Sequence, residues 1–264
     1  MNKAIGRALI LGLAAVSSGA MAQLVTLNNG GSTASFNIGT SAGNGNFGLN
    51  NWRIANGPNN VVQEVFAVTF PGAGVQTLNE LSAPVFSQPT ADLLNVQYIS
   101  GNVDFQVRYL LTGGAPNSAD LAEVVTIFNR NNGAVSFKFW EYDYFSPGGA
   151  TGGTGTLLNS STIKHTNNGW NVTVGATPIP DRWMIDTSGN VVNGIVAGNL
   201  TNANSPFSNP TDLAFAYQWN VTINPGETWQ MSKNKLLQAV PEPSTMVALA
   251  SLSALALFRR RKSK

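Results

Sequence analysis

The stretch LAFAYQWNVTINPGETWQMSKNKLLQ, residues 213–238, decides the fold. Along its first half, large apolar side chains alternate with polar or small ones, which is the period-two pattern of a strand with one buried face. The turn Asn224-Pro225-Gly226-Glu227 suits type II geometry, with proline at its second position and glycine at its third. Trp229 and Met231 then point back toward the core. The stretch therefore predicts a β-hairpin.

Upstream, the same alternation recurs. Residues 103–111 predict a half-buried strand, and residues 123–129 and 134–145 predict a second hairpin around Asn132-Gly133. Residues 61–70 also predict a strand, in which Glu64 interrupts the apolar face and suggests a sheet edge. We find no amphipathic helix of useful length before the C-terminal tail. Many short strands between Asn, Gly and Pro turns predict an all-β fold, an antiparallel and jelly-roll-like β-sandwich.

The N-terminal segment has the features of a secretory signal peptide. Lys3 and Arg7 precede an apolar run, residues 8–16, and Ala20-Met21-Ala22 is a small-x-small cleavage site. We expect export by Sec-type machinery and cleavage after Ala22. The alternative, an uncleaved N-terminal anchor, is less compatible with so short an apolar run.

The C-terminal segment, residues 240–264, reads VPEPSTMVALASLSALALFRRRKSK. Its paired prolines favour an extended strip. Residues 245–258 carry no charge or proline and would span about 21 Å as a helix, against a hydrocarbon core of about 30 Å. A basic cluster then stops transfer and stays cytoplasmic: Arg259, Arg260, Arg261 and Lys262. We expect a short membrane helix that anchors the chain in the inner membrane before processing.

This tail resembles the PEP-CTERM sorting signal of Gram-negative bacteria. The motif residues are Val240, Pro241, Glu242, Pro243, Ser244 and Thr245, followed by the apolar helix and the basic end. The resemblance implies cleavage by exosortase near the two prolines, delivery to the cell surface or extracellular matrix, and an exopolysaccharide-producing, biofilm-forming host. An ordinary C-terminal anchor is the alternative. The expected division is therefore a signal peptide (1–22), a β-sandwich body (23–239) and a sorting signal (240–264).

Composition limits the partners of the body. The chain has 15 basic and 13 acidic residues. The two terminal segments hold seven of the basic residues and one of the acidic residues, which leaves a net charge near −4 on the body, residues 23–239. Such a charge does not indicate a nucleic-acid-binding surface. The absence of cysteine excludes disulfides, thiol catalysis and cysteine zinc sites. No nucleotide-binding glycine pattern or other cofactor motif is found.

One strand carries two sets of candidate site residues on opposite faces. Glu141 and Asp143 lie two residues apart, with carboxyl groups about 6–7 Å apart, a spacing compatible with glycoside hydrolysis or calcium binding. Trp140, Tyr142 and Tyr144 could stack on sugar rings or pack in a core. Burial of unpaired carboxylates is costly, so we expect the aromatic side chains inside and the two acids in solvent.

The sequence shows no catalytic constellation. His165 is the only histidine, and its polar neighbours suggest a surface position. We therefore expect a structural or adhesive protein, not an enzyme, that contacts exopolysaccharide or matrix proteins. The alternatives are a lectin-like carbohydrate-binding module and a polysaccharide-active hydrolase. A hydrolase would bring Glu141 and Asp143 into one cleft with Asp181, Asp186 or Asp212, beside an exposed tryptophan.

Overall fold

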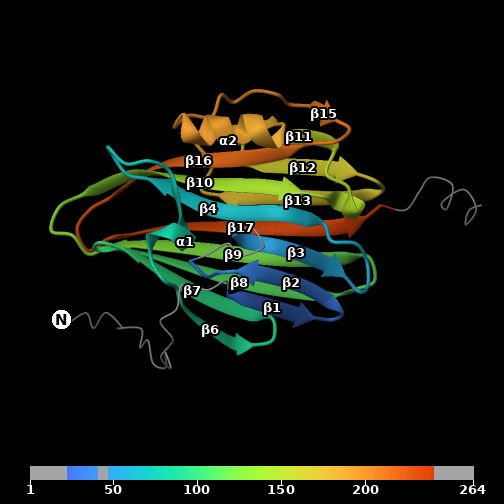
Figure 1. The fold of residues 1–264 in the computed structure, drawn as a ribbon, viewed down its shortest axis with the longest axis horizontal. Helices are drawn as coiled ribbons and strands as arrows, with labels where there is room; N and C mark the ends of the chain where they lie inside the picture. The colour runs from blue at the N-terminus through green and yellow to red at the C-terminus, as the bar shows by residue number, and fades with distance from the viewer. Residues whose placement is uncertain (1–22, 41–46, 241–264) are drawn as a thin grey trace, which may run out of the picture.

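The structure, a computed structural model, describes residues 23–40 and 47–240 and consists of two antiparallel β-sheets packed face to face (Figure 1). The predicted all-β sandwich is confirmed. The expected signal peptide and most of the sorting signal, including its apolar helix and basic end, lie outside the described residues. Within the described ranges, no helix is long and apolar enough to cross a membrane.

The first sheet, sheet A, has β4 and β10 at its centre and β1 and β14 at its edges. In spatial order its strands are β1 (Leu24–Asn29), β2 (Ser32–Asn37), β3 (Gly48–Ile54), β4 (Val61–Thr69), β10 (Val135–Phe145), β16 (Ala214–Ile223) and β14 (Arg182–Asp186), with β5 (Gln76–Thr77) paired to β4. Glu64 therefore lies on a central strand, and the expectation that it marks a sheet edge is wrong.

The second sheet, sheet B, is built around the long strands β17, β9 and β8. In spatial order its strands are β15 (Phe207–Asn209), β11 (Gly153–Asn159), β12 (Thr162–Asn167), β13 (Trp170–Thr177), β17 (Thr228–Ala239), β9 (Ser118–Asn129), β8 (Val103–Ala115), β7 (Leu93–Ser100) and β6 (Val85–Thr90). Along β9, buried and half-buried residues alternate without interruption, so every second side chain faces outward.

Both predicted hairpins are wrong in their pairing, although their strands form; residues 224–227 form the predicted turn, with a φ of +72° at Gly226, whereas neither Asn132 nor Gly133 has the positive φ of a tight hairpin turn. β9 pairs with β8 and β17 in sheet B, whereas β10 pairs with β4 and β16 in sheet A. Likewise, β16 lies in sheet A and β17 in sheet B. The turn at 224–227 closes with a hydrogen bond from Glu227 N–H to the Asn224 carbonyl at 3.1 Å. Each turn therefore carries the chain from one sheet to the other.

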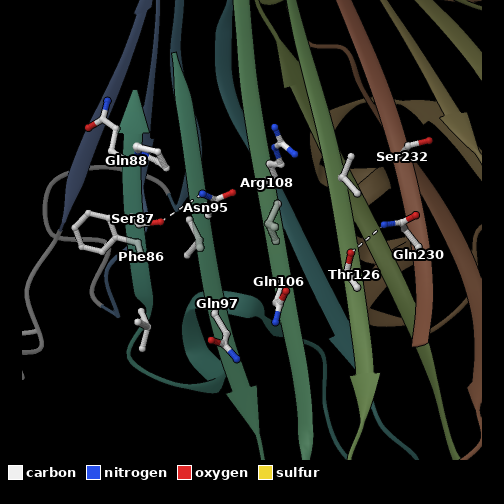
Figure 2. A pocket seen from close by; sticks show the side chains of 15 residues that line it. Phe86, Ser87, Gln88, Asn95, Gln97, Gln106, Arg108, Thr126, Gln230 and Ser232 are labelled. Carbon is white, nitrogen blue, oxygen red and sulfur yellow. Dashed lines mark hydrogen bonds between the residues drawn. The ribbon is translucent and has the colours of Figure 1, made fainter. Parts of the chain in front are cut away.

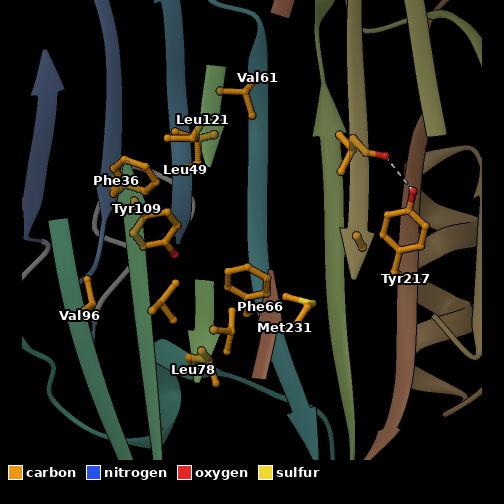
Figure 3. Packing of buried hydrophobic residues seen from close by; sticks show 14 of the residues in the cluster. Phe36, Leu49, Val61, Phe66, Leu78, Val96, Tyr109, Leu121, Tyr217 and Met231 are labelled. Carbon is orange, nitrogen blue, oxygen red and sulfur yellow. Dashed lines mark hydrogen bonds between the residues drawn. The ribbon is translucent and has the colours of Figure 1, made fainter. Parts of the chain in front are cut away.

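Aromatic side chains fill the space between the sheets. Phe139 is fully buried, and its ring lies 5.6 Å from that of Phe66, 6.3 Å from Trp219 and 5.8 Å from Trp229. Figure 3 shows buried side chains from both sheets meeting along the sandwich interior. Burial of such large apolar surfaces supplies the main stabilisation of a chain that has no cysteine.

In the part of the chain that the structure describes, two short α-helices and one 3-10 turn interrupt the strands: α1 (Leu78–Leu81), η1 (Pro147–Gly149) and α2 (Ser188–Val196). α2 is a helix that the sequence analysis missed. Thr187 caps it by accepting a hydrogen bond from the N–H of Asn190. Its buried Val191 and Ile195 belong to a second apolar cluster with Ala214 and Ala216 of β16, whose small side chains allow the helix close to the sheet. α2 thus covers part of the outer face of sheet A (Figure 1).

Candidate functional site

The outer face of sheet B carries a groove of about 870 Å³ that crosses β6, β7, β8, β9 and β17. Figure 2 shows its polar side chains distributed over all five strands. Neighbouring strands lie about 4.8 Å apart, so the groove extends across the sheet for roughly 19 Å. This length exceeds that of a single sugar ring and suits an extended polymer.

Strand register arranges the lining residues in two rows that run across the strands. Residues of one row are neighbours in the strand register, and they are Ser87, Asn95, Arg108, Val124 and Ser232. A second row runs parallel to the first and lies two residues away from it on each strand. Its members are Val85, Gln97, Gln106, Thr126 and Gln230. Side chains two apart on a strand share a face, so both rows point outward into the groove.

Apart from Val85 and Val124, the side chains of these rows are amides, hydroxyls and one guanidinium. Asn95 donates to the Ser87 hydroxyl at 3.3 Å, and Gln230 donates to the Thr126 hydroxyl at 3.2 Å. Within residues 23–40 and 47–240, no hydrogen bond or ion pair engages the exposed side chains of Gln106 and Arg108. Amides offer both donors and acceptors, and arginine offers a fork of donors that matches a carboxylate. The groove can therefore hold hydroxyl groups and an acidic group.

A second hollow of about 400 Å³ continues from the groove toward β13 and β12. It shares Ser232 with the groove and adds Thr162, Thr177 and Asn234. The outer face of sheet B is thus polar well beyond the five strands of the first hollow.

The predicted aromatic candidates for glycan contact lie elsewhere, on the outer face of sheet A. Trp140 is fully buried, and its indole N–H donates to the Thr69 hydroxyl at 3.1 Å. Tyr142 is 7% exposed and Tyr144 is half-buried, with ring centroids 6.5 Å apart. Trp140 and Tyr142 belong to the apolar cluster beneath α2 and present no open platform for a sugar.

The expectation that Glu141 and Asp143 face solvent is wrong. Both are fully buried in the sandwich interior, on the same face of β10 as Phe137 and Phe139. The physical reason is that β10 is covered on both faces, by sheet B on one side and by α2 on the other. The two acids are buried together with charged partners, which lowers the cost that made us expect them outside.

These partners form an ion cluster of six side chains between the sheets. Sheet A contributes Glu64, Glu141 and Asp143, and sheet B contributes Glu123, Lys233 and Lys235. Lys235 contacts Glu64 and Glu123. Lys233 contacts Glu141 and lies 3.3 Å from Glu123, 3.6 Å from Glu64 and 3.9 Å from Asp143.

Burial and charge act in opposite directions on the cluster. Burial raises the pKa of Asp143 well above its usual value, and burial together with nearby Glu64 raises the pKa of Glu123 to about 7. Burial would also raise the pKa of Glu64, but Lys235 and Lys233 hold it at about 2. Burial lowers the pKa of Lys233 to about 8. The cluster therefore favours an ionised Glu64 and disfavours charge on Asp143.

His165 is fully buried on the inner face of β12, so the expectation of a surface histidine is wrong. Its Nε2 lies 2.9 Å from the carbonyl oxygen of Gly152, to which the neutral ring donates. Burial lowers the pKa of His165 to about 4. Its polar sequence neighbours point outward from the same strand, which is why they gave no warning of its burial.

The other acids named for a hydrolytic cleft are not brought together with Glu141 and Asp143. Asp212 accepts from the N–H and hydroxyl of Ser188 at the start of α2, at 3.1 and 3.0 Å. Asp186 accepts from the N–H of Thr187, and Asp181 from the N–H of Asn220. Asp186 and Asp212 thus bind successive backbone N–H groups at the start of α2, whereas Asp181 binds a backbone group of β16.

Comparison with family models identifies the end of the chain. Residues 239–262 match the PEP-CTERM protein-sorting motif. The chain therefore carries this sorting signal, as its sequence indicated, and the signal implies an exported protein that exosortase processes. Comparison with curated proteins gives no match.

Solved structures identify the fold of the body. A protein from Escherichia coli K12 assigned provisionally as an aldose 1-epimerase has a TM-score of 0.54 at 9% identity, covering 83% of this chain and 99% of its own. A galactose mutarotase related enzyme from Lactobacillus acidophilus also has a TM-score of 0.54, at 9% identity and the same coverage. A bacterial glucoamylase in complex with acarbose has a TM-score of 0.56 at 11% identity, covering 92% of this chain but 37% of its own.

These neighbours correct the expectation that the chain is not an enzyme. They are a provisionally assigned aldose 1-epimerase, a mutarotase-related enzyme and a glucoamylase, so the β-sandwich of this chain is one that carbohydrate-active enzymes use. At such low identity the likeness concerns the fold alone, and no residue role is transferred from it.

The sequence predicts a half-buried strand over residues 103–111 but assigns Gln106 and Arg108, on its polar face, no site. The missing information was register, because only pairing with β7 and β9 aligns them with Asn95, Gln97 and Thr126. The available signal was the recurrence of polar side chains at alternate positions, Asn95 and Gln97 in residues 93–100 and Asp104, Gln106 and Arg108 in residues 103–111.

Proposed function

We propose that this chain is an exported carbohydrate-active protein that binds a polysaccharide in the groove on the outer face of sheet B. The observation that carries the proposal is the pair of transverse rows in which amide and hydroxyl groups flank the exposed guanidinium of Arg108. Concave sites with a few converging polar groups are the usual form of ligand sites in proteins. The fold, shared with carbohydrate-active enzymes, supports the same substrate class.

Arg108 gives the proposal its substrate preference. It is the only charged side chain that lines the groove within the described ranges, and it lies directly opposite Asn95 in the β7–β8 register. A guanidinium binds a carboxylate through two parallel hydrogen bonds. The polymer is therefore one that carries acidic groups, such as uronic acid units, and its hydroxyls contact Gln97, Gln106 and Gln230.

The sorting signal supports a place of action outside the cell. In this proposal the segment 1–22 directs export, the body 23–239 folds as one β-sandwich, and exosortase cleaves the chain near Pro241-Glu242-Pro243 and removes the tail. In this proposal the protein then works at the cell surface or in the extracellular matrix and binds the exopolysaccharide that the sorting signal implies.

The proposal is tested with the purified chain on an array of acidic and neutral polysaccharides, followed by measurement of product release from each polymer that binds. We expect binding of an acidic polymer, weakened at least about tenfold by Arg108→Gln, because a charge-assisted hydrogen bond contributes about 1.5–3 kcal/mol. Arg53→Gln is the matched control, since Arg53 lies in β3 of the opposite sheet. Equal binding by both variants, or no binding of any polymer, would refute the groove as the site.

A further inference from the structure

The amine of Lys233 and the carboxyl group of Glu141 contact each other between the two sheets. Lys233 belongs to β17 of sheet B and Glu141 to β10 of sheet A, so the contact joins the sheets. Neither side chain has any exposed surface. Within residues 23–40 and 47–240, Lys233 is the only group that binds either oxygen of the Glu141 carboxyl. An amine and a carboxyl group are thus held against each other in a region without solvent.

Three further acids surround the same amine. The Nζ of Lys233 lies 3.3 Å from Glu123 and 3.6 Å from Glu64. It lies 3.9 Å from Asp143, whose side-chain oxygens have no hydrogen-bond partner among the described residues. Burial raises the pKa of Asp143 well above its usual value, so this acid retains a proton that it can donate. Because the amine occupies the space between the acids, the calcium binding that the sequence allowed for Glu141 and Asp143 does not fit.

The two lysines of the cluster differ in their ability to react. Lys235 donates hydrogen bonds to Glu64 and Glu123. Burial would lower the pKa of Lys235, but these two acids raise it above its ordinary value, so the group stays an unreactive ammonium. Burial lowers the pKa of Lys233 to about 8, which makes the neutral, nucleophilic amine more accessible. Lys233 is therefore the lysine of the cluster that can attack a carboxyl carbon.

The surroundings of the pair favour condensation over hydrolysis. The ring of Phe66 lies 5.4 Å from the Nζ of Lys233, and the fully buried Phe139 shares a face of β10 with Glu141. Buried charges cost free energy, whereas an amide carries no charge. Fixed proximity can give two reacting groups an effective concentration of about 10⁵–10⁸ M. Exclusion of water then protects the product from hydrolysis.

We propose that Lys233 and Glu141 form a covalent amide bond that links sheet B to sheet A. The neutral Nζ attacks the Cδ of the protonated Glu141 side chain, so the N–C bond forms and the C–O bond to the hydroxyl group breaks. Asp143 gives its proton to the leaving hydroxyl and takes one from the nitrogen. One water molecule leaves, and no other reactant is consumed. The bond gives this chain, which has no cysteine, the kind of covalent link that disulfides provide in other exported proteins.

The test is the mass of the purified, folded wild-type chain, measured after denaturation. We expect a mass about 18 Da below that of its sequence, from the loss of one water molecule. After digestion, the peptide that contains Lys233 should be joined to the peptide that contains Glu141. An unchanged mass, or a separate peptide for each of the two residues, would overturn the proposal. The bond lies between the sheets, apart from the groove, so this result is independent of the proposed polysaccharide binding.

Variants then identify the reacting amine. Lys233→Arg keeps a positive charge but cannot form the amide, so its chain should have the full mass of its sequence. Lys235→Arg is the matched control, because it changes the neighbouring lysine of the same cluster and should still lose one water molecule. Circular dichroism identifies the variants that fold. Loss of water from a folded Lys233→Arg chain, with Lys235→Arg at full mass, would contradict the assignment.

The role of Asp143 is tested through the rate of bond formation. Wild type and Asp143→Asn are purified in the unfolded state, refolded by dilution from guanidinium, and sampled over time for the mass of the chain. The variant should form the bond at least about 100-fold more slowly, since proton transfer by a positioned side chain contributes about 10²–10⁴-fold to a rate. Equal rates in two chains that both refold would contradict the role of Asp143 as the proton donor.

Discussion

The buried imidazole of His165 makes the stability of the sandwich depend on pH in a calculable way. An exposed histidine has a pKa of 6.5, and burial lowers that of His165 to about 4. Between these values the unfolded chain binds a proton that the folded chain does not. Stability contributed by the neutral ring is therefore fully present above pH 6.5, falls as the pH decreases, and is lost below about pH 4.

The magnitude follows from the size of the shift. Each pKa unit corresponds to about 1.4 kcal/mol, so a shift from 6.5 to about 4 amounts to about 3 kcal/mol of unfolding free energy. Gln is the informative replacement, since its amide can donate to the Gly152 carbonyl, as the Nε2 of His165 does, without titrating. His165→Gln should thus remove this loss of unfolding free energy at acidic pH. Any effect of the substitution on packing is the same at every pH and does not obscure the result.

The assay is urea unfolding followed by tryptophan fluorescence at a series of pH values, for wild type and His165→Gln. Other groups titrate in both proteins, so the relevant quantity is the difference between their unfolding free energies. We expect this difference to shift in favour of the variant by about 3 kcal/mol between neutral pH and about pH 4. A constant difference across the series would refute the assignment of a neutral buried ring.

Two further predictions concern packing and backbone approach. Phe139→Ala should lower the unfolding free energy by about 3–5 kcal/mol in urea unfolding, because it empties the aromatic centre of the core; a loss below about 1 kcal/mol, the range of surface substitutions, would contradict that packing. Gly48→Ala should destabilise by at least about 1–2 kcal/mol, since Gly48 has a φ of +76° and an added Cβ would lie 1.8 Å from the Glu64 carbonyl oxygen. The control Gly133→Ala, where no atom lies within 4 Å of the added Cβ, should leave stability unchanged or raise it slightly; equal losses in both would contradict the close approach at Gly48.

The individual strands were predictable because alternation of apolar and polar residues is a local property. Residues 103–111 and 214–223 form strands as their pattern indicates. The partner of each strand was not predictable, because Asn132-Gly133 and the turn at 224–227 fix a reversal of the chain but not the sheet that it enters. A turn between two sheets uses the same residues as a hairpin.

The positions of Glu141 and His165 were misjudged for a related reason. Alternation shows which side chains share a face, but it does not show which face is covered when both are. β10 is covered by sheet B on one side and by α2 on the other, and the lysines that accompany Glu141 come from β17, more than 80 residues later. Only the assembled sandwich brings these charges together.

The central claim, a polysaccharide site on the outer face of sheet B, is tested most directly by a crystal structure of the chain with an acidic oligosaccharide. The account predicts sugar density across β7, β8 and β9, with a carboxylate of the ligand on the guanidinium of Arg108 and hydroxyls on Gln97 and Gln106. Density on the face covered by α2, beside Tyr144, would contradict it.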